Sequence, residues 1–136
     1  GESPAMLKKE LQQCMQLNFG VFRKEAPMLE GIKKLEELRE RIGKASLNDD
    51  SRAFNTARLE ALELDNLLEI AEATAISASG RRESRGAHAR DDFQTRDDEN
   101  WLCHSIFDPN TKTLSKRDVN FAPKTVPTFE PMERTY

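Results

Sequence analysis

The sequence of 136 residues is short of the apolar residues and cysteines that mark several large classes of protein. Hydrophobic residues make up 37% of it and charged residues 33%, against about a quarter charged in typical soluble domains. No stretch approaches the ~18 uncharged apolar residues of a membrane-spanning helix, and no apolar run follows a basic N-terminal patch. We therefore expect neither a membrane span nor a signal peptide. Two cysteines, Cys14 and Cys103, are too few for a disulfide framework and favour a reducing compartment.

The sequence also lacks the charge and the motifs of nucleic-acid, nucleotide and metal sites. Its 21 Lys and Arg residues are outnumbered by 24 Asp and Glu residues, which leaves a net charge of −3. A nucleic-acid-binding surface needs a basic excess, so we predict no nucleic-acid partner. No glycine-rich phosphate-binding motif occurs. Cys103 and His104 are adjacent and would point to opposite faces of a strand, so we predict neither a metal site nor a Cys–His catalytic pair.

The placement of the prolines divides the chain into two parts. The helical patterns of residues 1–80 include prolines only where helices begin, whereas residues 109–136 are spaced by four prolines. We predict a mainly α fold, with an antiparallel three-helix bundle of the spectrin-repeat type over residues 1–80. Residues 81–136 are expected to form an arginine-rich loop, a β-hairpin and an extended, proline-spaced tail that packs on the bundle.

Two helices are predicted before residue 43. The first covers residues 4–18, where apolar residues at three- and four-residue steps share one face. The second covers residues 26–42 and is expected to end at Gly43 in a left-handed C-cap. Phe19 and Phe22, which lie in the connection, are expected to close one end of the core.

The third predicted helix, residues 52–79, has the most regular pattern. Cap candidates occupy residues 48–51, and Gly80 is expected to end the helix. Leu62, Leu67 and Ile70 flank its seam and are expected to widen the buried face, which favours an antiparallel bundle over a parallel dimer. The seam itself is rich in alanine, which lets neighbouring helices approach closely: Phe54, Ala57, Ala61, Leu64, Leu68, Ala71, Ala75 and Ala78.

Residues 81–100, here called the arginine segment, hold five arginines and six acidic residues. Three interpretations are open for this segment. Arginines paired with nearby acids would hold the loop against another surface, as a structural or interface network, and this is the preferred interpretation. The loop would otherwise be solvated, or its guanidinium groups would bind a carboxylate or phosphate. The arginines available for such an anion are Arg81, Arg82, Arg85 and Arg90.

The remainder of the chain is predicted to be a short turn, a hairpin and a tail. Asp97 or Asp98 is expected to cap a short turn that carries Trp101. Residues 103–107 and 113–121 are predicted to pair as strands of a β-hairpin, because the residues between them are typical of a turn.

Motifs in the arginine segment resemble those of a known family. ESRGAH at residues 83–88, followed by DDENW at residues 97–101, is similar to the C-terminal region of the succinate dehydrogenase flavoprotein subunit of the bacterial type. The fumarate reductase flavoprotein and, more distantly, L-aspartate oxidase carry a related helical region. The resemblance covers essentially the whole chain, including residues 15–23 and the ending ERTY at residues 133–136.

The resemblance implies a parent subunit that oxidises succinate to fumarate by hydride transfer to a covalently attached FAD. It implies that electrons then pass to an iron–sulfur subunit and to quinone at membrane anchor subunits, at the cytoplasmic face of the bacterial inner membrane. The flavin-binding domain and the substrate-binding residues of the family lie upstream of this region. No catalytic, cofactor-binding or metal-binding residue is therefore expected in this chain.

The expected role is that of a non-catalytic structural domain in an oxidoreductase subunit. The resemblance implies that the arginine segment docks against the flavin-binding domain of the same subunit. The alternative is a free-standing helical interaction module that acts through the third helix, and an anion-binding domain is a weaker third possibility. The interface candidates are Glu83, Arg85, His88, Arg90 and Trp101.

Overall fold

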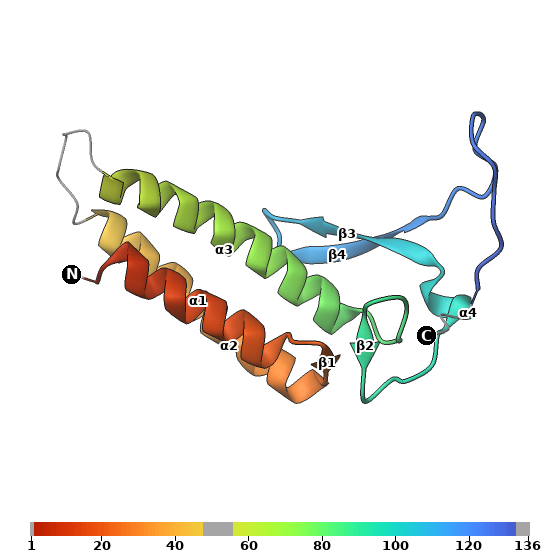
Figure 1. Cartoon of the computed structure of the whole chain (residues 1–136), viewed down its shortest axis with the longest axis horizontal. Coiled ribbons are helices and arrows are strands. Elements are labelled where there is room, and N and C mark those ends of the chain that lie inside the picture. Colours follow the sequence, from red (N-terminus) through yellow and green to blue (C-terminus); the bar gives the residue numbers. More distant parts are fainter. Residues whose placement is uncertain (1, 48–55, 133–136) are drawn as a thin grey trace.

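The computed structural model describes residues 2–47 and 56–132, and it is mainly helical with a small antiparallel β-hairpin (Figure 1). The prediction of a mainly α fold with a hairpin is confirmed. The elements in chain order are α1 (Pro4–Asn18), β1 (Phe22–Arg23), α2 (Glu25–Leu47), α3 (Thr56–Gly80), β2 (Ala89–Arg90), α4 (Asp98–Trp101), β3 (Cys103–Asp108) and β4 (Thr113–Asp118).

Helix α1 has the bounds that the sequence predicts. The Ser3 hydroxyl accepts a hydrogen bond of 3.3 Å from a backbone N–H of the first turn. Pro4 begins the helix, where its missing N–H costs nothing. Because apolar residues recur at three- and four-residue steps, one face of the helix is buried, formed by Leu7, Leu11, Cys14 and Asn18.

The three long helices share one hydrophobic core. Helix α2 runs back along α1 and α3 runs back along α2, and each of the three contacts the other two (Figure 1). Helix α3 contributes Leu64 and Leu68 toward its start and small residues, Ala71, Ala75 and Ala78, toward its end. The alanines let the other helices come close but bury little apolar area. The arginine segment packs at this alanine-lined end of α3.

Helix α2 extends past its predicted end. It runs to Leu47, five residues beyond the predicted end at Ile42, so the expected C-cap at Gly43 is wrong. A glycine C-cap needs a left-handed backbone, and among the glycines of the described ranges only Gly86 has a positive φ. Ala45 packs against the core, so the helix gains contacts by continuing through Gly43.

Helix α3 ends at Gly80 as predicted, and its seam residues from Leu64 to Ala78 are buried. The cap candidates at residues 48–51 and Phe54 lie outside the described residues. The prediction of a widened apolar face is wrong, because α1 and α2 cover only the seam. The flanking apolar residues are exposed: Leu62, Leu67 and Ile70.

The connection between α1 and α2 closes one end of the core with one phenylalanine rather than two. Phe19 is 5% exposed, whereas Phe22 is 75% exposed, so the prediction for Phe22 is wrong. Successive side chains of a strand point to opposite faces, and β1 turns Arg23 inward and Phe22 outward. Phe19 lies directly over Gly31 of α2, where an added Cβ would come within 2.4 Å of its ring.

The hairpin of β3 and β4 packs against α3. Its register places Cys103 opposite Asp118 and Asp108 opposite Thr113. Strand β4 is three residues shorter than predicted, and residues 119–132 contain no helix or strand. Leu114 of β4 contacts Gly80, which fixes the hairpin at the end of α3. None of the helices in the two described ranges is long and apolar enough to cross a membrane.

Two glycines of α2 provide a matched test of this packing. Gly31→Ala is expected to lower the free energy of unfolding by about 1–3 kcal/mol, because the new Cβ would overlap the Phe19 ring and lie 2.7 Å from Cβ of Asn18. Gly43→Ala meets no atom within 4 Å and is expected to raise that free energy by about 0.5–1 kcal/mol. Urea denaturation of the two variants and the parent chain measures both. Equal effects at the two positions would contradict the close approach of α1 and α2.

Candidate functional site

The arginine segment docks on the connection between α1 and α2. Strand β2 pairs in parallel with β1, with Phe22 opposite Ala89 and Arg23 opposite Arg90. The Asp91 N–H donates to the Arg23 carbonyl at 2.8 Å. These backbone contacts join residues more than sixty positions apart, so the segment has a fixed place on the helices.

An ion pair between the buried Arg90 and the partly exposed Asp92 connects the ends of two helices. Arg90 is 1% exposed and donates to both carboxylate oxygens of Asp92 at 2.8 Å. Its remaining nitrogen, Nη1, donates to the carbonyls of Ser79 at 3.0 Å and Arg81 at 3.3 Å, where α3 ends. Asp92 in turn accepts from the Glu25 N–H at 3.0 Å, where α2 begins.

Each partner of this pair lies at the helix end that suits its charge. Carbonyl groups left free at a helix C-terminus attract a cation, and free N–H groups at an N-terminus attract an anion. The hydrogen bonds from Arg90 and the Glu25 N–H hold the pKa of Asp92 far below its usual range. The charged form of Asp92 is therefore favoured, and the pair acts as a cap for both helices.

Glu83 is the second buried charge of the segment. It is completely buried and accepts hydrogen bonds from Arg81 at 2.6 Å, from Arg85 at 2.8 and 3.1 Å, and from the Asp97 N–H at 2.9 Å. Burial alone would raise the pKa of Glu83, but the hydrogen bonds from Arg85, Asp97 and Arg81 outweigh it and lower the pKa. The charged form of the carboxylate is thus favoured, and it holds Arg81 and Arg85 on one side and the backbone at Asp97 on the other.

Arg81 connects the end of α3 to the hairpin. Its guanidinium donates to the carbonyls of Trp101 at 2.9 Å and Cys103 at 2.6 Å, in addition to Glu83. It also lies 5.2 Å from the centre of the Trp101 ring, while the Lys116 ammonium lies 4.0 Å from that ring. Trp101 is carried by α4, which is capped by Asp97, one of the two residues expected in that role.

His88 is held as a neutral imidazole. Nδ1 lies 2.9 Å from Nη1 of Arg23, and an arginine can only donate, so Nδ1 accepts and Nε2 carries the proton. Nε2 then donates to the Arg81 carbonyl at 2.9 Å. Burial lowers the pKa of His88, the Arg81 carbonyl opposes this, and the charges of Arg23, Arg90 and Arg81 lower it further. His88 is a neutral bridge between β1 and the end of α3.

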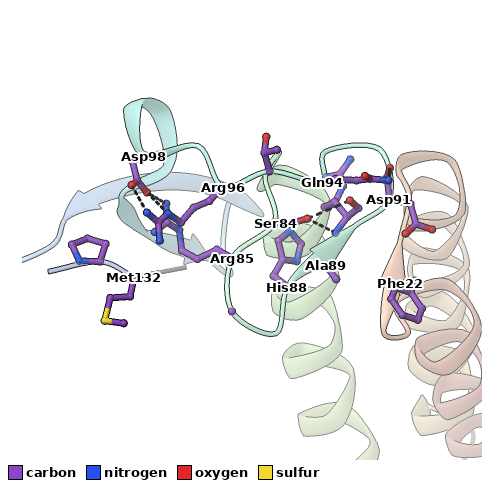
Figure 2. Close-up of a pocket in the computed structure, with 14 residues that line it drawn as sticks. Phe22, Ser84, Arg85, His88, Ala89, Asp91, Gln94, Arg96, Asp98 and Met132 are labelled. Atoms are coloured by element: carbon purple, nitrogen blue, oxygen red, sulfur yellow. Dashed lines mark hydrogen bonds and ion pairs between the residues drawn. The ribbon is translucent and has the colours of Figure 1, made fainter. Parts of the chain in front are cut away.

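An open groove of about 880 Å³ lies on the outer side of the segment (Figure 2). Figure 2 shows Arg85 and Arg96 together on Asp98 at one end of the groove and Phe22 at the other. Arg85 donates to one oxygen of Asp98 at 2.6 Å, and Arg96 donates to the other oxygen at 3.0 Å. Two guanidinium groups therefore share one carboxylate. Met132 of the chain's last described stretch lies beside them.

The structure brings the five predicted site residues into one connected network. Glu83 and Arg90 are buried in the chain itself, so their side chains act on an outside partner only by positioning other residues. Arg85 and His88 are partly exposed along the groove, and Trp101 is joined to the rest through Arg81. The geometry favours the structural-network interpretation, and the interface roles stay predictions.

Three members of the network were missed in the sequence. Arg23 and Glu25 lie about 65 positions from their partners, and a single sequence carries no signal for such distant pairs. Asp92 follows Arg90 by two residues, and this spacing in a loop was a signal that could have been used. Within residues 2–47 and 56–132, no cluster of His, Cys, Asp and Glu side chains is arranged to hold a metal ion.

Comparison with known proteins gives consistent matches over nearly the whole chain. A family model described as the fumarate reductase flavoprotein C-terminal region matches residues 8–136. The chain is 49% identical over 133 residues to the succinate dehydrogenase flavoprotein subunit of Coxiella burnetii, covering 98% of this chain and 22% of that protein. It is 34% identical over 136 residues to the fumarate reductase flavoprotein subunit of Mycobacterium tuberculosis, covering 100% of this chain and 23% of that protein.

A solved structure shows the same arrangement. An FrdA variant of E. coli quinol fumarate reductase superposes with a TM-score of 0.79 at 37% identity, covering 96% of this chain and 23% of that chain. The present chain therefore spans less than a quarter of the length of the relatives it matches.

Removing the buried charge of Glu83 tests the network. Glu83→Gln is expected to lower the free energy of unfolding by about 3–5 kcal/mol, because Arg81 would lose its carboxylate at a buried position and Arg85 would keep only Asp98. Glu30→Gln, in an exposed pair with Lys34, is the matched control and should change that free energy by less than about 0.5 kcal/mol. Urea denaturation compares the two variants, and similar small losses would contradict a structural role for Glu83.

The neutral state of His88 predicts a pH dependence of stability. Its folded pKa is lowered below the ordinary value of 6.5, so the unfolded chain takes up the proton first as the pH falls. The contribution of His88 is fully present above pH 6.5 and is lost as the pH falls from 6.5 toward the folded pKa.

Urea denaturation between pH 7.5 and 5.5 measures this loss in the parent chain. His88→Gln supplies one donor and one acceptor without a titratable proton and should flatten the profile. His104→Gln, at the exposed histidine of β3, should keep the parent's profile. Profiles that are equally steep with and without His88 would contradict the assignment.

Proposed function

The chain belongs to the fumarate reductase flavoprotein C-terminal family, and from this we propose that it is the structural C-terminal domain of a succinate dehydrogenase flavoprotein subunit. The observation that carries the proposal is the match over residues 8–136 combined with coverage of less than a quarter of each relative. A region of this size, joined to a body more than three times larger, serves the parent subunit rather than acting alone.

In this proposal residues 1–80 are an antiparallel three-helix bundle and residues 81–136 pack on it. The mutual contacts of α1, α2 and α3 support the first part. The contacts of the hairpin with α3 and the pairing of β1 with β2 support the second. The proline-spaced residues beyond β4 form an extended tail whose burial is completed by the rest of the subunit.

The parent subunit oxidises succinate to fumarate with covalently attached FAD and passes electrons to an iron–sulfur subunit and to quinone at membrane anchor subunits. The names of the relatives, which are succinate dehydrogenase and fumarate reductase flavoprotein subunits, support this activity. The complex places the chain peripherally at the cytoplasmic face of the bacterial inner membrane. The flavin-binding domain, the iron–sulfur subunit and the anchors are the partners.

The described residues do not fit FAD. A dinucleotide pyrophosphate is commonly bound by the free N–H groups at a helix N-terminus. At the helix N-termini nearest the arginine segment, backbone N–H groups already have side-chain acceptors. Asp92 accepts from the Glu25 N–H of α2, and Asp97 caps α4. Arg90 is also fully used on Asp92 and on carbonyls at the end of α3. The flavin chemistry is therefore assigned to the part of the parent subunit outside this chain.

The alternative function is a free-standing helical interaction module. The exposed apolar residues on the outer side of α3, Leu59, Leu62 and Ile70, favour it, because they offer a surface for a partner helix. The reading frame upstream of residue 1 separates the two proposals. A flavin-binding domain continuous with this chain supports the first, and a start codon at this point supports the second.

Substitution of Arg85 in the full subunit tests the proposed role. Arg85→Ala removes a partner of both Glu83 and Asp98, so it is expected to lower the content of bound flavin or the assembly with the iron–sulfur subunit. Flavin absorbance per subunit and succinate-dependent dye reduction measure the loss.

Arg58→Ala, at an exposed position of α3, is the matched control and should retain the parent's flavin content. Arg85→Lys keeps the charge and should show a smaller loss than alanine. Unchanged flavin content, assembly and activity in Arg85→Ala would contradict the proposed role. The isolated chain should be colourless. A yellow, active preparation of the isolated chain would also contradict the proposed role.

A further inference from the structure

We propose that the β3–β4 hairpin is a flap that opens from α3 as a unit of its own while the helix bundle stays folded, and that the ion pair between Lys112 and Glu72 is its latch. The inference goes beyond the proposed function and does not depend on it. Four observations carry it, namely the burial of the hairpin, the positions of its attachments, the two partners of Glu72 and the backbone of Lys112.

The hairpin is attached to the helices without contributing to their core. The side chains of the hydrophobic core all lie between Leu7 and Ala78, and no residue of β3 or β4 is buried. The bundle can therefore keep its core when the hairpin moves. A two-stranded hairpin is only marginally stable by itself, so the order of this one depends on its attachments to α3.

These attachments lie at two levels of the hairpin. At its base, Arg81 donates to the Cys103 carbonyl at 2.6 Å and to the Ser105 hydroxyl at 3.1 Å. Nearer the turn, Leu114 contacts the end of α3, and Nζ of Lys112 lies 3.6 Å from a carboxylate oxygen of Glu72. Figure 1 shows the turn beside the middle of α3 and the base toward α4.

The base is the hinge in this arrangement and the turn is the free end. Arg81 also donates to the buried Glu83 at 2.6 Å, so the hinge belongs to the network that holds the arginine segment. The turn has no such connection. Opening breaks the contact of Leu114 and the ion pair of Lys112, while the arginine segment stays in place.

Glu72 can release Lys112 and still keep a charged partner. Its buried carboxylate accepts hydrogen bonds of 2.7 and 2.8 Å from Arg39 of α2. A buried carboxylate without any partner would be strongly destabilising, but Arg39 prevents this when the hairpin opens. The Lys112 side chain is 38% exposed, so water is already available to its ammonium group. The pair can therefore open without disturbing the contact between α2 and α3.

Lys112 occupies a backbone position that suits glycine better than lysine. Its φ is 55°, and among the described residues it is the one non-glycine with a positive φ. Its N–H donates to the Asp108 carbonyl at 2.7 Å, which closes the turn. Glycine adopts this conformation without strain, but it has no ammonium group to reach Glu72. The lysine thus strains the turn and gains the contact with α3.

Hydrogen exchange of backbone amides in the 136-residue chain tests the separate opening. The amides that pair β3 with β4 are expected to share one protection factor, lower by about tenfold or more than that of Leu35 and Leu68 in the core. Low concentrations of urea should speed the exchange of the core amides more, because local opening exposes less surface than unfolding. Equal protection with equal urea dependence would overturn the proposal, since the hairpin would then open only with the whole chain.

Removing the charge of Lys112 tests the latch. Lys112→Gln keeps a long polar side chain on the same backbone and is expected to speed exchange in the hairpin about threefold, the scale of a partly exposed ion pair. The core amides should keep the parent's rates. Lys112→Arg retains the charge and should stay close to the parent. Lys124→Gln, at an exposed lysine of the tail, is the matched control and should change neither region.

Salt adds a readout that depends on charge alone. About 1 M NaCl screens an ion pair, so it should bring hairpin exchange in the parent chain, measured against the core amides, to the level of Lys112→Gln. The same salt should change Lys112→Gln little. Equal exchange in Lys112→Gln and Lys112→Arg would overturn the latch, and equal acceleration of the hairpin and core amides in Lys112→Gln would overturn the separate opening.

Discussion

The Arg90–Asp92 pair is the interaction on which the arrangement of this chain depends. It holds the C-terminal end of α3 and the N-terminal end of α2 through one guanidinium and one carboxylate. The Arg90 guanidinium is buried and Asp92 is partly exposed, so removing Asp92 would leave a buried charge without its carboxylate. The effect of the pair is mainly on geometry, because only one placement of the arginine segment satisfies both helix ends. The pairing of β1 with β2 and the position of His88 follow from that placement.

The network also explains how the alanine-lined end of α3 is held in place in a chain with so few apolar residues. The seam of α3 becomes alanine just where the segment packs, so apolar burial is smallest at Ala75 and Ala78. Charged side chains with directed hydrogen bonds replace the missing apolar contacts there. Glu83 and Arg81 extend this replacement to the hairpin, which shares only a few contacts with α3. The polar part of the chain is thus held against α3 by directed hydrogen bonds.

Local patterns in the sequence were enough to predict the helices and the hairpin, because caps and periodicity are short-range properties. The bounds of α1 and the end of α3 at Gly80 were correct for this reason. The predictions of a C-cap at Gly43 and of a buried Phe22 were wrong because tertiary contacts decide both. Ala45 packs against the core when α2 continues past Gly43, and β1 turns Phe22 outward. Such contacts cannot be read from spacing in a single sequence.

The candidate site shows the same division. The density of arginines and acids marked the right segment, and its predicted residues do form one network, but Arg23 and Glu25 of that network come from the connection between α1 and α2, far away in the sequence. Burial then separates residues that look alike in the sequence. Arg90 is committed to internal acceptors, whereas Arg96 stays at the surface with donors to spare among the described residues. Three-dimensional burial therefore decides which arginines of such a segment are committed to internal acceptors and which stay partly exposed.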